Sequence, residues 1–196
     1  MIALARTFIF ALLLMLCLGS AAHADEAEEL QAGIDAYRAK NFQATIEKVL
    51  PLAIKGNAEA QYIISIMYAD GKGFPKNQCA SVIWVEKAAR QGHAYAAVAM
   101  AYAYSGIGGI KRNDELAYRW MAYGNKQGHP DVLEDMDFLA RYITAEKRAE
   151  IDEDIKTWDP SILPAPEFFP ISRKIFKPAE FTVLLRQTYG ITACSN

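Results

Sequence analysis

Several features that would indicate a particular chemistry are scarce or missing in this chain of 196 residues. Its 21 lysines and arginines do not outnumber its 23 acidic residues, and a net charge of -2 leaves no basic excess to neutralise a phosphate backbone. We therefore expect no nucleic-acid partner. No G-x-S-x-G, H-E-x-x-H, C-x-x-C or P-loop motif occurs. These absences predict a protein that is not an enzyme and that holds no cofactor.

The sequence also lacks an apolar run of about 20 residues, the length that a membrane-spanning helix requires. Its longest apolar stretch, Phe8–Leu18, follows the single charge of Arg6 and precedes an A-x-A site at Ala22–Ala24. This order is typical of a secretory signal peptide over residues 1–24. We expect cleavage between Ala24 and Asp25, a periplasmic or secreted mature protein, and no membrane insertion after cleavage.

Cysteine is rare, with three residues in the whole chain, and export would leave only Cys79 and Cys194. Two cysteines do not form a disulfide framework, although an oxidising compartment allows them to pair. Cys79 lies among apolar residues of an expected helix, where a buried free thiol is equally plausible. The sequence leaves both states open.

The middle of the chain contains an internal repeat. Residues 57–92 and 93–128 align without gaps, and far more positions are identical than the two or three expected by chance. The identical pairs are Ala58/Ala94, Ala60/Ala96, Tyr68/Tyr104, Gly73/Gly109, Asn77/Asn113, Trp84/Trp120, Gln91/Gln127 and Gly92/Gly128. Because Trp84 and Trp120 recur, we expect them to occupy equivalent buried positions.

Each repeat has the pattern of an antiparallel helix pair. Residues 58–69 contain no glycine or proline and predict a first helix, A. The glycines and proline of 70–75 predict a turn, and apolar residues at helical spacing over 80–92 predict a second helix, B. Residues 29–56 and 130–158 carry weaker forms of this pattern, with Thr144 as an expected N-cap. We therefore predict an all-α repeat domain of about four pairs over 25–158.

The repeat motifs resemble a known family. Gly56-Asn57-Ala58-Glu59-Ala60-Gln61-Tyr62, Tyr68-Ala69-Asp70-Gly71-Lys72-Gly73 and Trp84-Val85-Glu86-Lys87-Ala88-Ala89-Arg90-Gln91-Gly92 are similar to the Sel-one-like repeat, a relative of the tetratricopeptide helix pair. The resemblance implies a right-handed α-solenoid that binds other proteins. The sequence departs from the family pattern at Ser65 and Ala101, which replace the usual glycine of helix A, and in the second turn, which is shifted by one residue.

The last segment, residues 159–196, differs in composition. It contains five of the eight prolines, so residues 159–177 cannot form one continuous helix. Pro178 suits the start of a short terminal helix, whose apolar stripe is Phe181, Leu184, Leu185 and Tyr189. Because this proline-rich extension also contains several phenylalanines, we expect it to pack back along the solenoid.

Two groups of residues could be taken for metal sites. His93 and His129 occupy equivalent repeat positions directly after glycine, where the start of a helix explains them. The acidic run Glu150–Asp154 suits the solvated outer face of a terminal repeat. Since neither group has the further ligands that a site needs, we expect no bound metal.

These observations favour a periplasmic protein–protein interaction module, an adaptor, regulator or scaffold that binds its partner on the concave face of the solenoid. A toxin-immunity-type inhibitor is the alternative. A β-lactamase-like hydrolase is a weaker one, since members of the family described in that way resemble this chain but carry a cysteine pair in each repeat. Here Glu115 stands 36 residues after Cys79, so that pattern is absent.

In helix-pair solenoids, stacked A helices form one continuous surface. The A-helix positions not required for packing between helices are the expected partner-binding residues: Glu59, Tyr62, Ile66, Tyr95, Val98, Tyr102, Asp131, Glu134 and Phe138. Their mixture of aromatic and acidic side chains suits a peptide with apolar anchors and some basic character. Two alternatives stay open: Tyr62, Val98 and Tyr102 belong to the core, or the chain's own residues 168–189 occupy the surface.

Overall fold

A computed structural model describes residues 24–107 and 109–166 of the chain. The regular elements in these residues are all helices, which confirms the all-α prediction. The chain divides into two compact units, one ending at Leu52 and the other beginning at Ala53.

The first unit is a helical hairpin. Residues 24–38 form its first helix, which ends where Lys40 adopts a left-handed conformation (φ 59°) and the Asn41 amide donates to the Ala36 carbonyl. Helix α2 (Phe42–Lys55) begins in this unit. The two helices pack closely because Gly33 has no side chain: a Cβ there would lie only 2.4 Å from Cγ2 of Val49. The weak pattern over residues 29–56 therefore does correspond to a pair of helices.

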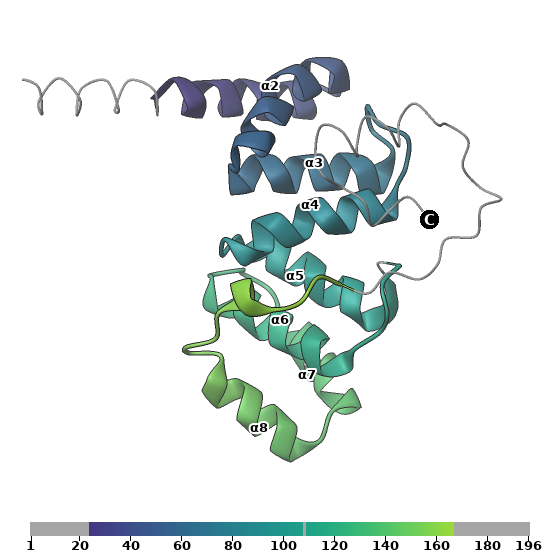
Figure 1. Cartoon of the computed structure of the whole chain (residues 1–196), viewed down its shortest axis with the longest axis vertical. Coiled ribbons are helices and arrows are strands. Elements are labelled where there is room, and N and C mark those ends of the chain that lie inside the picture. The colour runs from purple at the N-terminus through teal and green to yellow at the C-terminus, as the bar shows by residue number, and fades with distance from the viewer. Residues whose placement is uncertain (1–23, 108, 167–196) are drawn as a thin grey trace, which may run out of the picture. The chain divides into compact units, whose positions relative to one another are not determined.

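The second unit is a stack of antiparallel helices, most of which pack against the next along the chain (Figure 1). The A and B helices of the first clear repeat appear within two residues of their expected bounds. The elements are α3 (Ala58–Asp70), α4 (Gln78–Arg90), α5 (Ala94–Tyr102), the π-helical turn η1 (Ala103–Ile107), α6 (Asp114–Lys126), α7 (Leu133–Leu139), the 3-10 turn η2 (Ala140–Tyr142) and α8 (Ala145–Asp154).

Equivalent residues cap the helices of the two repeats. The Oδ1 atoms of Asn77 and Asn113 each accept the backbone N–H three residues later, at the starts of α4 and α6. Asn57 caps α3 in the same way, and at the equivalent position His93 caps α5 through Nδ1. An N-cap satisfies one of the free donors of a helix's first turn. Capping therefore explains why asparagine recurs at the start of helix B.

The turns between A and B helices are closed by one recurring backbone bond. The amide of Asn77 donates to the Tyr68 carbonyl, and that of Asn113 to the Tyr104 carbonyl, both at 2.9 Å. The second repeat reaches this bond differently, because its A helix ends in the π-helical turn η1 and reverses at Gly106 (φ 108°). This widened turn is the structural form of the one-residue shift expected there.

The core between the helices is built from small and very large side chains. Trp84 and Trp120 are each 1% exposed, as their recurrence predicted, and many of the other buried residues are alanines. Gly124 of α6 allows an especially close approach to α5, since a Cβ there would lie 2.7 Å from Cγ2 of Val98.

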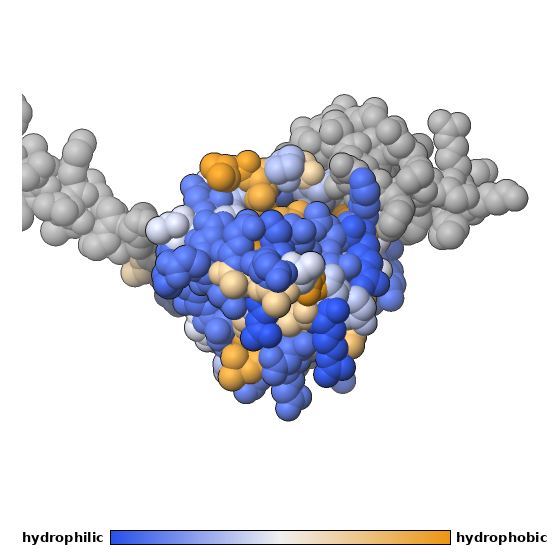
Figure 2. Space-filling model, turned by 90° about the horizontal axis from the view of Figure 1, so that it is seen from below, coloured by the Kyte–Doolittle hydropathy of each residue, from blue (hydrophilic) through white to orange (hydrophobic). Residues whose placement is uncertain are grey.

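The last described pair carries the acidic run. Thr144 caps α8, since its hydroxyl accepts the Lys147 amide at 3.2 Å, as predicted. Within Glu150–Asp154 only Ile151 is buried, so the carboxylates do form a solvated face. Figure 2 looks at the molecule from below, the side on which Figure 1 shows α8, and this view is mostly hydrophilic.

The described part of the C-terminal extension, residues 159–166, forms a strap that runs back over α4. The guanidinium of Arg90 donates to four strap carbonyls, those of Pro160 (2.7 Å), Ser161 (3.0 Å), Leu163 (2.9 Å) and Pro164 (3.3 Å). Glu86 accepts from the same guanidinium at 2.6 Å and holds it in place. The expected helix after Pro178 lies outside the described residues.

Replacing Arg90 with methionine should free the strap, because the methionine keeps the apolar stem but donates no hydrogen bond to the carbonyls. Hydrogen–deuterium exchange of peptides covering residues 158–166 should become faster, while α6 should stay protected. Arg38→Met is the matched control, since the ion pair that Arg38 makes with Asp35 is exposed. Equal exchange in Arg90→Met and the parent protein would contradict this role for Arg90.

Candidate partner-binding surface

Aromatic rings on α3, at the start of α5 and in the turn before α7 lie one beside the next. The ring centroid of Tyr62 is 4.7 Å from that of His93 and 6.2 Å from that of Tyr95, and Tyr95 lies 4.4 Å from His129. We call these four residues the aromatic ladder. Tyr95 is 49% exposed, so the ladder presents a large apolar ring to solvent.

His93 connects the ladder to the helix framework. Its Nδ1 accepts the Ala96 amide at 3.1 Å, so the ring proton belongs on Nε2, which lies 2.8 Å from Oε2 of Glu59. This hydrogen bond from His93 lowers the pKa of Glu59, and the partial burial of the carboxylate opposes the effect. The Glu59 carboxylate therefore stays ionised and orients His93 beside Tyr62.

Glu59→Gln should lower the melting temperature at pH 6–7, because the ionised carboxylate is the favoured partner of His93. A depressed folded-state pKa adds stability that is present above the unfolded value and is lost as pH falls through the folded value. The difference in melting temperature between parent and variant should therefore begin to shrink as pH falls past about 4.3, the ordinary glutamate value, and should vanish only below the lowered pKa of folded Glu59. Thermal unfolding followed by circular dichroism across pH 3–7 measures it.

Glu134→Gln is the control for this experiment, since Glu134 is an exposed acid on α7 with no hydrogen bond or ion pair described for its carboxylate. Its melting temperature should follow that of the parent protein throughout. A Glu59→Gln difference that stays constant from pH 7 to pH 3 would refute the coupling to His93.

A second exposed aromatic group extends the surface toward α7. The hydroxyl of Tyr102, 39% exposed, donates to Oδ2 of Asp135 at 2.7 Å, and this bond raises the pKa of Tyr102 to about 12. Phe138 and Tyr142 pack edge to face with centroids 5.4 Å apart, and the guanidinium of Arg112 lies over the Tyr142 ring. The phenol of Tyr102 is thus a fixed hydrogen-bond donor at neutral pH.

An apolar groove of about 200 Å³ runs between α3 and α5, beside this second aromatic group. Its walls include Tyr62 and Ile66 of α3, Tyr102 of α5 and Ile107 of η1, and Val82 of α4 contributes to the floor. None of the residues lining the α3/α5 groove is charged. Such a groove accommodates apolar side chains of a peptide.

The structure brings most of the expected binding residues to this surface. Tyr62 and Ile66 are half-buried in the groove wall, and Glu59, Tyr95, Tyr102, Glu134 and Phe138 are exposed.

Two of the expected binding residues, Val98 and Asp131, were wrong. Val98 is 6% exposed and faces Gly124, so it belongs to the core, as one of the sequence alternatives proposed.

Asp131 is exposed but does not lie on an A helix, because α7 starts only at Leu133. The first helical bond of that unit joins the Met136 amide to the Val132 carbonyl, and Val132 is 1% exposed. Burial of Val132 therefore fixes where this helix begins, and His129 accepts the Asp131 amide in a local turn before it.

Sequence reasoning missed four contributors to the surface: His93, His129, Ile107 and Tyr142. The histidines were recognised only as helix starts, although their spacing of 36 residues matched that of the A-helix positions. Ile107 is 70% exposed and lies in a widened turn that the repeat alignment cannot place. Tyr142 belongs to a 3-10 turn with no counterpart in the clear repeats.

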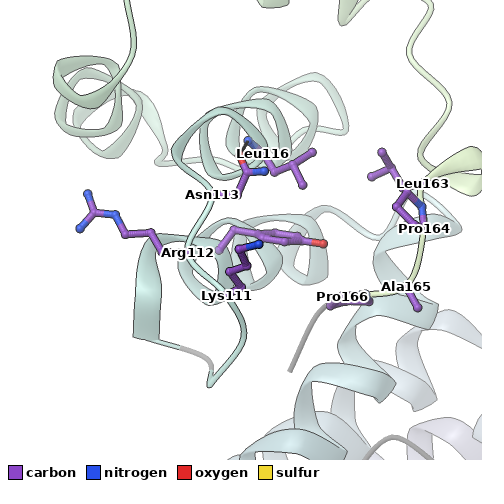
Figure 3. Close-up of a pocket in the computed structure, with 9 residues that line it drawn as sticks. Lys111, Arg112, Asn113, Leu116, Leu163, Pro164, Ala165 and Pro166 are labelled. Carbon is purple, nitrogen blue, oxygen red and sulfur yellow. Dashed lines mark hydrogen bonds between the residues drawn. The ribbon is translucent and has the colours of Figure 1, made fainter. Parts of the chain in front are cut away.

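A separate cavity of about 190 Å³ lies between the strap and the second inter-helix turn (Figure 3). Tyr104, Lys111 and Leu116 line one side, and Leu163–Pro166 line the other. Arg112 points away from the strap in Figure 3, and its guanidinium pairs with Asp114 at 2.8 Å. The strap cavity is therefore mainly apolar. The ammonium group of Lys111 is the charged group that faces the cavity.

The described residues contain no group of three or more histidine, cysteine, aspartate or glutamate side chains arranged to hold a metal ion. In the same part of the chain, no helix is both long and apolar enough to cross a membrane.

Two successive antiparallel pairs, capped at equivalent positions and closed by the same backbone bond, define a helical-repeat solenoid. The family model of the Sel1 (Sel-one-like) repeat matches residues 58–93 and 94–129, one residue later than the repeats inferred from self-similarity. The chain therefore contains two Sel1 repeats, which form a helical module of a kind that generally binds proteins.

Solved structures show the same fold. A protective antigen present in uropathogenic Escherichia coli strains, which displays an SLR fold, superposes with a TM-score of 0.61 at 21% identity, over 79% of this chain and 36% of that one. A Sel1 repeat protein from Oxalobacter formigenes gives a TM-score of 0.53 at 29% identity, over 62% of this chain and 55% of that one. This chain thus spans about a third to a half of their lengths, and no curated protein matches its sequence.

Proposed function

We propose that the mature protein is exported to the periplasm and acts there as a protein-binding adaptor or regulator, without catalytic activity. The observation that carries the proposal is the continuous surface made by the aromatic ladder, Tyr102, Phe138 and the α3/α5 groove. Large aromatic side chains with a polar tip are the residues that dominate protein interfaces.

The charges around this surface support a particular type of partner. Glu59 and Asp135 place carboxylates beside rings of this surface, Glu134 is exposed on α7, and the groove itself has no charged lining residue. A peptide segment with apolar anchors would fill the groove, and basic residues next to those anchors would meet the carboxylates. This complementarity favours a helical or extended segment of another protein.

Crosslinking in cells followed by mass spectrometry identifies the partner, and surface variants then test where it binds. Tyr95→Ala/Tyr102→Ala should keep the circular dichroism spectrum of the parent, because both side chains are exposed, and should lose the crosslinked partner. Ile162→Ala is the control, since Ile162 is also a large apolar residue exposed to solvent, but on the strap. Unchanged crosslinking by the double variant would reject this surface as the binding site.

A further inference from the structure

One structural feature is not used by the proposed binding surface, although it lies next to it: Cys79 forms a disulfide. Cys79 lies in the first turn of α4 and is 5% exposed. Its neighbours Gln78, Ser81 and Val82 line the α3/α5 groove. Whatever chain segment carries the second sulfur is therefore held at the edge of that groove.

The sequence restricts the candidates for that second sulfur. The chain has three cysteines, and apart from Cys79 these are Cys17 and Cys194. Cys17 falls in the expected signal peptide, so only Cys194 stays with Cys79 in the mature chain. Joining the two thiols releases two protons and two electrons, which pass to a disulfide-type oxidant of the oxidising compartment.

The strap approaches the same region from the other side. Pro166, where the described strap ends, is buried and lines the strap cavity together with Tyr104. Ala103 and Ile107, on the same π-helical turn as Tyr104, line the α3/α5 groove. Between Pro166 and Cys194 lie 27 residues. At about 3.3 Å per extended residue or 1.5 Å per helical residue, they are ample to cross from one cavity to the other.

The sequence of this segment suits the groove chemically. Residues 178–190 repeat apolar side chains at helical spacing, with Phe181, Leu184, Leu185 and Tyr189 on one stripe. From Pro178 to Asn196 only Glu180 and Arg186 are charged. An apolar stripe of this kind matches a groove whose lining residues carry no charge.

We propose that a Cys79–Cys194 disulfide tethers the C-terminal segment and that its apolar stripe, residues 181–189, occupies the α3/α5 groove of the same chain. If the groove binds a partner, as the proposed function states, the segment competes with that partner for the same surface. The tether raises the local concentration of the segment, so the partner binds the groove only after displacing it.

Two measurements on the full mature chain test the proposal. Peptide mapping without reduction should recover one disulfide-linked pair of peptides that contain Cys79 and Cys194. Photocrosslinking should then locate the segment, with p-benzoylphenylalanine in place of Tyr102 in the groove wall. It should crosslink to residues 178–193 of the same chain, and Cys194→Ser should lose most of that product.

The matched control places the photocrosslinker at Tyr95, which is exposed on the same face but does not line the groove. It should give little crosslink to residues 178–193. The proposal fails if Cys79 is reduced or paired otherwise, if the Tyr102 probe does not reach the segment, or if the product joins two chains. A Tyr102 probe that captures another protein and never the segment would overturn this inference while supporting the proposed function.

Discussion

Trp84→Ala should lower the free energy of unfolding by about 3–5 kcal/mol, a large share of the stability of a domain of this size. Trp84 is 1% exposed, so removal of its indole leaves a buried cavity that the surrounding helices close only in part. Urea unfolding followed by circular dichroism measures the change. Trp120→Ala, at the equivalent position of the next repeat, should cost a similar amount.

Phenylalanine variants separate the lost volume from the lost indole N–H. Nε1 of Trp120 is buried with no hydrogen-bond partner among the described residues, so Trp120→Phe sacrifices no hydrogen bond. It should cost clearly less than Trp120→Ala. A Trp84→Ala variant with an unchanged urea midpoint would contradict the buried, repeat-equivalent positions of the two tryptophans.

Gly124→Val should destabilise the second repeat by about 3 kcal/mol, the upper range for overpacking a tight helix contact. A Cβ at residue 124 would lie 2.7 Å from Cγ2 of Val98 and 3.3 Å from the Ala94 carbonyl, so α5 and α6 would have to separate. Valine gains only a few tenths of a kcal/mol over glycine in helix propensity, too little to compensate.

Asn125→Val is the matched control, because it introduces the same side chain at the next helical position, which is exposed. It should change the free energy of unfolding by less than about 0.5 kcal/mol. Equal effects of the two substitutions would show that α5 and α6 do not approach each other as closely as Gly124 allows.

Features that depend on local chemistry could be predicted from the sequence. Asn77, Asn113 and Thr144 mark helix starts because their side chains accept amide hydrogens of the same turn, and local hydrogen bonds of this kind leave a sequence signature. The recurrence of Trp84 and Trp120 likewise predicted equivalent burial. Helix pairs and their order follow from such signals alone.

Features that depend on contacts between residues distant in the sequence could not be predicted from it. Val98 and Tyr62 hold the same repeat position, yet Val98 is buried because α6 presents glycine at residue 124, where α4 presents Ala88. The anchoring of the strap by Arg90 could not be predicted either. Its guanidinium donates hydrogen bonds to main-chain carbonyls, and because every residue has a carbonyl, such contacts leave no signature in the sequence. Which residues are exposed on the candidate surface could therefore be determined only from the structure.

The bonds from Arg90 to the strap change how the stack is expected to unfold. In an open helical-repeat array each unit touches only its neighbours, so helices at the end can fray while those in the middle persist. Here contacts 70 to 74 residues apart in sequence connect α4 to the segment that follows α8. Unfolding of the terminal helices should therefore also destabilise the first clear repeat. The repeats should unfold more cooperatively than those of an open array, because the two ends of the stack are connected.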